Sequence, residues 1–236
     1  FSSMLGLEFG RIQFTPDLLP SDITGSEILN IDYKTQKRSF DFCRGPVFVN
    51  LLLGDEINRA SPRTQSAMLE AMQERNVTIS GKFHNLPSPF MVFATQNPYE
   101  YEGTFPLPEA QLDRFMLHTI VDYPDADAEK KILSEHVADK LIGENMHKPH
   151  KVKMDIASIQ KVMLSVKRVS VADPLVNAVV ELVNLTRPHT EECPKDYRDK
   201  ILYGAGPRAG MSLISSARSL AFLEAQFVFS LKCLFL

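Results

Sequence analysis

The sequence predicts an α/β fold in which a parallel sheet is flanked by helices and followed by a region built only of helices. Short apolar runs such as Val47–Leu53, rich in Val, Phe and Leu, have the length and composition of strands buried on both faces. Helix patterns lie between these runs, as in proteins with parallel sheets. We therefore expect an α/β core at residues 1–142 and a helical domain at residues 143–236.

Composition narrows the class of protein. The chain has 236 residues, of which 44% are hydrophobic, which is enough for a real core and excludes a disordered chain. The net charge of −3 provides no basic field for nucleic acid. The three cysteines fit neither a metal spacing nor a disulfide framework, as is usual in a reducing cytosol. No apolar stretch approaches the roughly 20 residues that a membrane span needs. We therefore expect a cytoplasmic protein without a membrane span or a nucleic-acid partner.

Four apolar runs are predicted to be core strands, namely Glu8–Thr15, Val47–Leu53, Phe90–Thr95 and Met116–Val121. Two hairpins are predicted, one at Ile31–Phe42 and one at Val77–Ser80 with Lys82–Leu86. The helices expected among them are a helix end at Phe1–Leu7, a short helix within Asp17–Ile28, a helix capped by Ser61, a short helix after Pro108, and Asp125–His136.

The second half of the chain is predicted to be helical. A basic, apolar-poor stretch at Gly143–Lys153 marks the expected domain boundary. The helices that follow are Asp155–Val166, Asp173–Arg187, which should be buried on most sides, and Pro207–Gln226. The last ten residues, FVFSLKCLFL, are too short for a membrane span. We expect the helical domain to be incomplete at this end, and the alternative is a genuine variant of the chain end.

Two adjacent acids, Asp55 and Glu56, directly follow the most apolar run. Adjacent carboxylates at the end of a buried strand cost desolvation energy unless a cation lies opposite them. A magnesium ion that carries nucleotide phosphates is one such cation. Asp55 could then hold the metal through water, and Glu56 could orient and deprotonate the attacking water. The simpler alternative is a strand that ends in a solvated acidic turn.

A second apolar run ends in the polar sequence Gln96-Asn97-Pro98. In open α/β sheets, ligands bind at the carboxyl ends of the strands, so Asn97 and the two acids could converge on one ligand. The alternative interpretation of Asn97 is an ordinary Asn-Pro turn.

Three long blocks of sequence resemble the MoxR family of AAA+ ATPases. They are FTPDLLPSDITGSEI, GDEINRASPRTQSAMLEAMQERNVTISG and ATQNPYEYEGTFPLPEAQLDRF, and the resemblance runs from Phe1 to about Gln226. The resemblance implies a P-loop-type core with strand order 5-1-4-3-2 and a helical lid. It also implies a homo-oligomeric ring, a hexamer in this family, that binds ATP and Mg²⁺ between its subunits. The implied function is chaperone-like remodelling of client proteins. The family's clients include proteins with von Willebrand A-type domains.

The resemblance also gives roles to three residues. Asn97 matches the sensor 1 asparagine, which positions the lytic water. Arg114 matches the arginine finger, which reaches the nucleotide of a neighbouring subunit, although a surface ion pair with Asp113 or Glu109 is the alternative. Arg208 matches the sensor 2 arginine, which links the lid to nucleotide. Gly206, two residues earlier, replaces the family's usual serine. The alternative is that Arg208 is an ordinary arginine in the first turn of a helix. The role of Arg59 stays open.

The chain has no G-x-x-x-x-G-K-[ST] phosphate loop. We therefore expect a fragment that lacks this loop and the first core strand, is inactive by itself, and leaves Phe90–Thr95 unpaired with Met116–Val121. The alternatives are a hydrolysis-dead remnant, a nucleotide-independent protein-interaction module, or a related ring motor that acts on DNA or in metal chelation.

Overall fold

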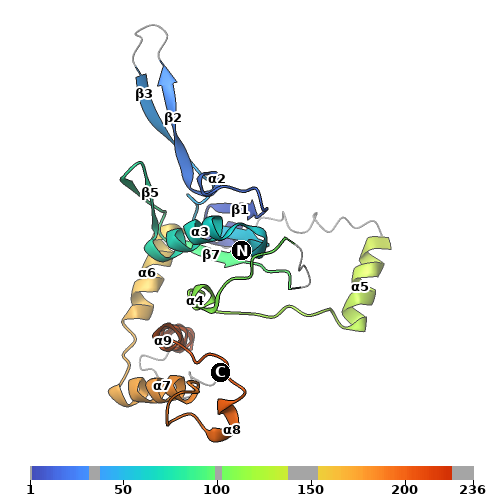
Figure 1. Ribbon diagram of the computed structural model, residues 1–236, viewed down its shortest axis with the longest axis vertical. Helices are drawn as coiled ribbons and strands as arrows, with labels where there is room; N and C mark the ends of the chain where they lie inside the picture. The colour runs from blue at the N-terminus through green and yellow to red at the C-terminus, as the bar shows by residue number, and fades with distance from the viewer. Residues whose placement is uncertain (1, 32–37, 99–102, 138–153, 225–236) are drawn as a thin grey trace.

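The computed structural model describes residues 2–31, 38–98, 103–137 and 154–224 (Figure 1). Its central sheet has three parallel strands in the order β1-β4-β7, with bounds β1 (Phe9–Gln13), β4 (Leu51–Asp55) and β7 (Met91–Ala94). Three of the four predicted core strands and their order are thereby confirmed. The central strand begins later than expected, because the chain forms turns and bends up to residue 50 before it joins the sheet.

The fourth predicted strand, Met116–Val121, is wrong. These residues form no strand, and among the described residues nothing pairs with the second edge of β7. An extended segment needs a hydrogen-bonded neighbour to bury its side chains. Without one, Leu117 and Val121 are 75% and 89% exposed. The prediction that Phe90–Thr95 and Met116–Val121 are unpaired is confirmed.

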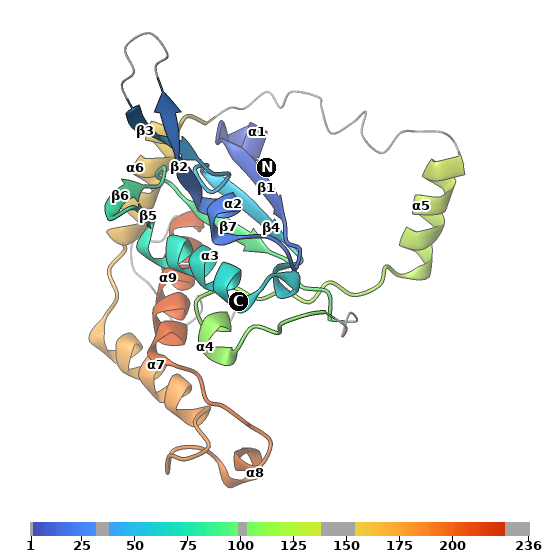
Figure 2. The same ribbon diagram turned by 45° about the horizontal axis from the view of Figure 1, so that its top comes forward.

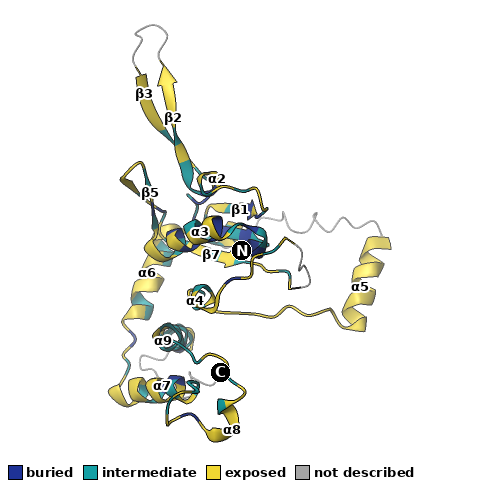
Figure 3. Ribbon diagram, in the orientation of Figure 1, coloured by how far each residue is buried: buried dark blue, intermediate teal, exposed yellow. Residues whose placement is uncertain are grey.

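One face of the sheet carries the core. The helices α2 (Pro20–Thr24) and α3 (Pro62–Glu74) pack on this face (Figures 2 and 3). The cluster of buried side chains there includes Ile12, Leu52 and Met68. The start of α3 follows the predicted signal, because the Ser61 side chain accepts a hydrogen bond from the backbone N–H of Thr64.

The opposite face of the sheet is partly open to solvent, although Leu51 on this face is buried. It presents Phe9, Met91 and Phe93, which are 52%, 51% and 48% exposed. Arg11 and Asp55 lie on this same face, since alternate residues of a strand point to one side and the register pairs Arg11 with Leu53.

Two hairpins project from the core. The hairpin of β2 (Gly25–Ile31) and β3 (Arg38–Arg44) begins earlier than predicted, because Gly25, with φ at 91°, turns the end of α2 directly into a strand. The hairpin of β5 (Asn76–Ile79) and β6 (Lys82–Asn85) is confirmed.

The remaining helices are α1 (Ser2–Leu5), α4 (Glu109–Leu112), α5 (Ala126–Val137), α6 (Ile156–Lys167), α7 (Asp173–Leu185), α8 (Lys195–Arg198) and α9 (Pro207–Leu223). All but α8 lie where the sequence predicts a helix, and α8 lies where it predicts none. Asp125 and Asp155 each accept a backbone hydrogen bond at the first turn of a helix. The expectation that α7 is buried on most sides is wrong, because α9 covers only the face with Val179 and Val183.

The proposed domain boundary at 143–153 lies outside the described residues, as does the chain end at 225–236, so the division into 1–142 and 143–236 stays a prediction. No helix in the described ranges has the length and apolar character needed to cross a membrane.

Candidate functional site

A sharp turn after β4 brings the two acids to the carboxyl end of the sheet. Gly54 is required before this turn, because a Cβ at that position would lie 2.9 Å from the Phe14 ring. Glu56 has φ at 56°, a left-handed conformation that is rare for residues other than glycine. It leads directly into the 3₁₀ helix η1 (Ile57–Arg59). Such conformations concentrate at functional sites, where the surrounding contacts hold them in place.

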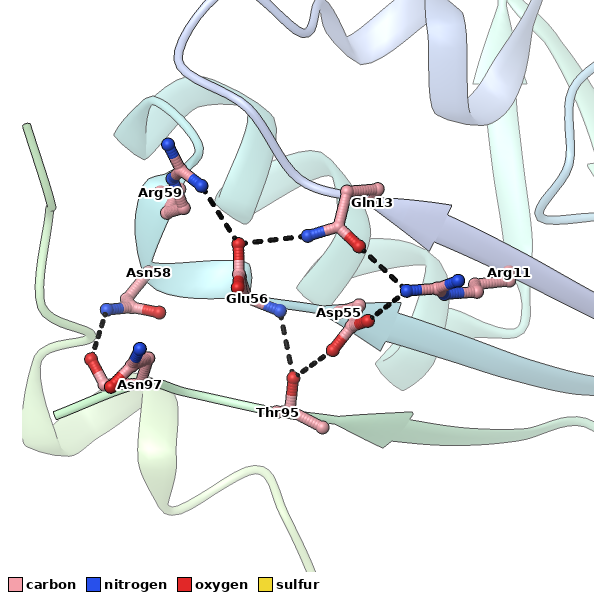
Figure 4. Close-up of polar contacts among 8 residues, drawn as sticks. All are labelled: Arg11, Gln13, Asp55, Glu56, Asn58, Arg59, Thr95 and Asn97. Atoms are coloured by element: carbon pink, nitrogen blue, oxygen red, sulfur yellow. Dashed lines mark hydrogen bonds and ion pairs between the residues drawn. The ribbon is translucent and has the colours of Figure 1, made fainter. Parts of the chain in front are cut away.

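Asp55 accepts hydrogen bonds from two donors, one on β1 and one just after β7 (Figure 4). The Thr95 hydroxyl, just after β7, donates to Asp55 Oδ1 at 2.5 Å. The Arg11 guanidinium, on β1, donates to Asp55 Oδ2 at 2.6 Å. The hydrogen bond from Thr95 and then that from Arg11 hold the pKa of the Asp55 carboxyl below its usual value. Asp55 is therefore an anion at neutral pH.

Glu56 is held by three contacts. Gln13 Nε2 and Arg59 Nη1 donate to its Oε2 atom at 2.9 and 3.1 Å. Its backbone N–H donates to the Thr95 hydroxyl at 2.9 Å. The open question about Arg59 is thereby answered in part, since Arg59 pairs with Glu56 within the same turn.

The carboxyl ends of β4 and β7 lie side by side, and the convergence of their polar groups on one ligand stays a prediction. Backbone hydrogen bonds join Thr95 to the acid turn, from Ile57 N–H to the Thr95 carbonyl at 3.0 Å and from Thr95 N–H to the Gly54 carbonyl at 2.9 Å. Asn97 follows two residues later and is half-buried, and its carbonyl accepts a hydrogen bond from Asn58 Nδ2 at 3.2 Å. Asn97 and the two acids therefore lie at one edge of the sheet (Figure 4).

Arg114 and Arg208 occupy a different place. Both line a cavity of about 200 Å³ between the end of α4 and the first turns of α9. Arg208 lies 3.8 Å from the Asp113 carboxylate, and the absence of a Cβ at Gly206 allows Asp113 to come close to the helix start. In the described part of the chain, no hydrogen bond or ion pair joins either arginine to the acid turn. Asp113, weighed above as a partner for Arg114, pairs with Arg208 instead.

The donor set at the acid turn fits magnesium bound through water and phosphate. A carboxylate oxygen of Asp55 and the hydroxyl oxygen of Thr95 lie together at the strand ends, the Glu56 carboxylate belongs to the next residue, and such oxygens suit this hard cation. No group of three or more His, Cys, Asp or Glu side chains in the described ranges could enclose a metal ion alone.

Sequence reasoning missed Arg11, Gln13 and Thr95. The signal for the first two was weak but present, since Arg11 and Gln13 are alternate residues of one predicted strand and must point to the same face. The register that places this face beside Asp55 and Glu56 is a tertiary feature.

Known proteins resemble the chain in both sequence and structure. Residues 1–117 match the model of the "ATPase family associated with various cellular activities (AAA)". The chain is 42% identical over 220 residues to the uncharacterised protein YeaC of Bacillus subtilis, a match that covers 93% of the chain and 63% of YeaC. It is 41% identical over 231 residues to Chaperone MoxR1 of Mycobacterium tuberculosis, covering 96% of the chain and 57% of that protein. The chain thus spans less than two thirds of the length of these curated relatives.

A solved structure agrees with these relatives. The crystal structure of a candidate ATPase from Cytophaga hutchinsonii superposes on the chain with a TM-score of 0.80 at 34% identity, covering 99% of the chain and 68% of that protein. The sequence blocks, the parallel sheet with its acid turn, and these similarities lead to one conclusion. The chain belongs to the MoxR family of AAA+ ATPases.

Proposed function

We propose that the protein binds and hydrolyses ATP with Mg²⁺, with Glu56 as the base that activates water and Asp55 as the residue that holds the metal through its water shell. The observation that carries this proposal is the convergence of Asp55, Glu56 and Asn97 at the carboxyl ends of adjacent parallel strands. When bound, the metal would stabilise negative charge on the phosphates. Asn97 would orient the water, since an amide both donates and accepts hydrogen bonds.

We further propose that the protein works as a cytoplasmic homo-oligomeric ring that remodels client proteins, including proteins with von Willebrand A-type domains. Its support is the family assignment, together with the name Chaperone MoxR1 of one relative. In such a ring, Arg114 would act on the nucleotide of a neighbouring subunit, which agrees with its separation from the acid turn of its own chain. Arg208, at the start of α9, would link the lid to nucleotide.

The deciding experiment measures ATP turnover by the full-length gene product that contains these residues. Glu56→Gln should retain ATP binding and reduce turnover by at least ~100-fold, the typical effect of losing a general base. Glu70→Gln, an exposed carboxylate on α3, is the matched control and should leave turnover unchanged. Wild-type turnover in Glu56→Gln would refute the assignment of Glu56. An absence of turnover in the unmodified protein would favour the remnant or the interaction module.

Calorimetry on the 236-residue chain itself supplies a second test. Since the sequence holds no phosphate loop, we expect weak ATP binding or none, although the acid turn is formed. Micromolar affinity would contradict this expectation.

A further inference from the structure

Two polar side chains next to the acid turn are buried deeply without taking part in the proposed chemistry. Gln65, on α3, is 1% exposed, and Asn58, in η1, is 7% exposed. Polar side chains buried to this extent are normally held by hydrogen bonds, so their partners indicate what they stabilise. The carbonyl groups that accept hydrogen bonds from these two side-chain amides all lie outside α3.

The partners of Gln65 lie in two separate segments. Its Nε2 atom donates to the carbonyl of Ile57, the residue after Glu56, at 3.2 Å. The same atom donates to the carbonyl of Phe105 at 2.8 Å. One amide group on a rigid helix therefore ties the acid turn to a segment that lies 40 residues beyond Gln65.

Asn58 lies in the acid turn and contacts the chain at two later points, Asn97 and Phe105. Its Nδ2 atom donates to the Asn97 carbonyl at 3.2 Å, and its own backbone carbonyl accepts from the Phe105 N–H at 2.6 Å. Two residues beyond Phe105, Leu107 is buried in the core cluster, and the chain then enters α4, which precedes Arg114.

We propose that Asn58 and Gln65 are positioning residues, which hold the chain at Asn97 and at Phe105 against the turn that carries Glu56. This polar latch fixes the distance between the water-orienting amide and the base. It also fixes the start of the segment that leads to Arg114. The proposal rests on the proposed function insofar as it gives Asn97 and Glu56 their roles in hydrolysis.

Misplacement of a catalytic group by about 1 Å can cost about 100-fold in rate, whereas nucleotide binding depends on other contacts. Loss of the latch should therefore lower kcat with little change in KM for ATP. A purely structural role would lower the amount of folded enzyme and leave the kcat of the folded fraction unchanged.

The test variant is Gln65→Met in the full-length gene product, because methionine keeps the length of the side chain and cannot donate. Steady-state ATPase kinetics should show kcat reduced by about 10- to 100-fold and KM changed by less than about 3-fold. Hydrogen exchange without nucleotide should be faster by about 10-fold in peptides that cover residues 103–112. The matched control is Gln160→Met, which also removes an amide that donates to a backbone carbonyl, that of Ser88, and should change neither readout.

Asn58→Ala is the second variant, and it carries the test if Gln65→Met shows no cooperative unfolding transition. A folded Gln65→Met variant with wild-type kcat or wild-type exchange at 103–112 would overturn the proposal. A folded Asn58→Ala variant is judged by kcat alone, because it keeps the backbone carbonyl that accepts from the Phe105 N–H, and wild-type kcat in it would also overturn the proposal. If the unmodified protein does not hydrolyse ATP, the proposed function fails, and the exchange measurement alone decides whether the latch exists.

Discussion

Thr95 makes the closest contact in the acid turn, and its replacement gives the sharpest test of the site. Its hydroxyl donates to Asp55 and accepts from the N–H of Glu56. Thr95→Val keeps the shape of the side chain and removes both hydrogen bonds. A bond to a neutral group contributes about 0.5–1.5 kcal/mol, and one to a charged group about 1.5–3 kcal/mol.

Solvent lowers the expected cost. The Asp55 side chain is 24% exposed, so water can replace part of the lost hydrogen bond, and the lower end of each range applies. Thr95→Val should then destabilise the protein by about 2 kcal/mol at neutral pH. Urea denaturation measures this change in the free energy of unfolding. Thr78→Val on β5 is the control, because Thr78 is exposed and its hydroxyl makes no hydrogen bond within the part of the chain that the structure describes.

The pH dependence identifies the carboxyl that is responsible. Since the folded-state pKa of Asp55 is lowered, the carboxylate stabilises the fold at pH values above its ordinary pKa of about 4. That contribution is lost as the pH falls through the lowered value. The stability difference between wild type and Thr95→Val should therefore shrink in acid, and NMR titration should show the Asp55 pKa of the variant raised. An unchanged Asp55 titration would refute the reasoning.

Three further predictions concern other parts of the chain. Mixed rings of Arg114→Ala and Glu56→Gln subunits should regain some ATPase activity, because some sites then receive an intact Glu56 from one subunit and an intact Arg114 from its neighbour. If rings that native mass spectrometry shows to be mixed regain no activity, Arg114 does not act across the interface. Gly54→Ala should lower the free energy of unfolding by about 1–3 kcal/mol, because the new methyl group meets the Phe14 ring at 2.9 Å, and wild-type stability by urea denaturation would contradict this. Asp155→Ala should lower the thermal unfolding midpoint by removing the helix cap, whereas Asp155→Asn should keep the midpoint near the wild-type value. The hydrogen bonds from Ser158 lower the pKa of Asp155, so the difference in midpoint between wild type and Asp155→Ala should become smaller in acid, where the carboxylate is protonated.

Local signals predicted the central strands and the helix starts well. Ser61 and Asp155 cap their helices as the sequence indicates, because a cap depends on residues within one turn. The parallel order β1-β4-β7 followed from the family resemblance and is confirmed. The strand predicted at Met116–Val121 is wrong because a strand depends on a hydrogen-bonded neighbour, and the residues of the segment do not show whether that neighbour is present.

The contacts of the acid turn could not be predicted, because they depend on register. Arg11 and Gln13 reach the acids only because Gln13 pairs with Asp55 across the parallel ladder. A shift by one residue would turn both side chains to the opposite face of the sheet. The sequence shows which residues are polar on β1, whereas only the paired structure shows which acid each of them contacts.

These contacts also show which positive charges balance the two adjacent acids, a question that the sequence left open. Two adjacent carboxylates at the end of a largely buried strand require nearby positive charge. The structure provides one arginine for each acid, with Arg11 on Asp55 and Arg59 on Glu56. Arg11 comes from the neighbouring strand and is 57% exposed, so it can leave Asp55 without disturbing the core, whereas Arg59 belongs to the turn itself. Asp55, which is proposed to hold the metal, is therefore paired with Arg11, the cation that can move away more easily. Glu56, which is proposed as the base, is paired with Arg59 of its own turn.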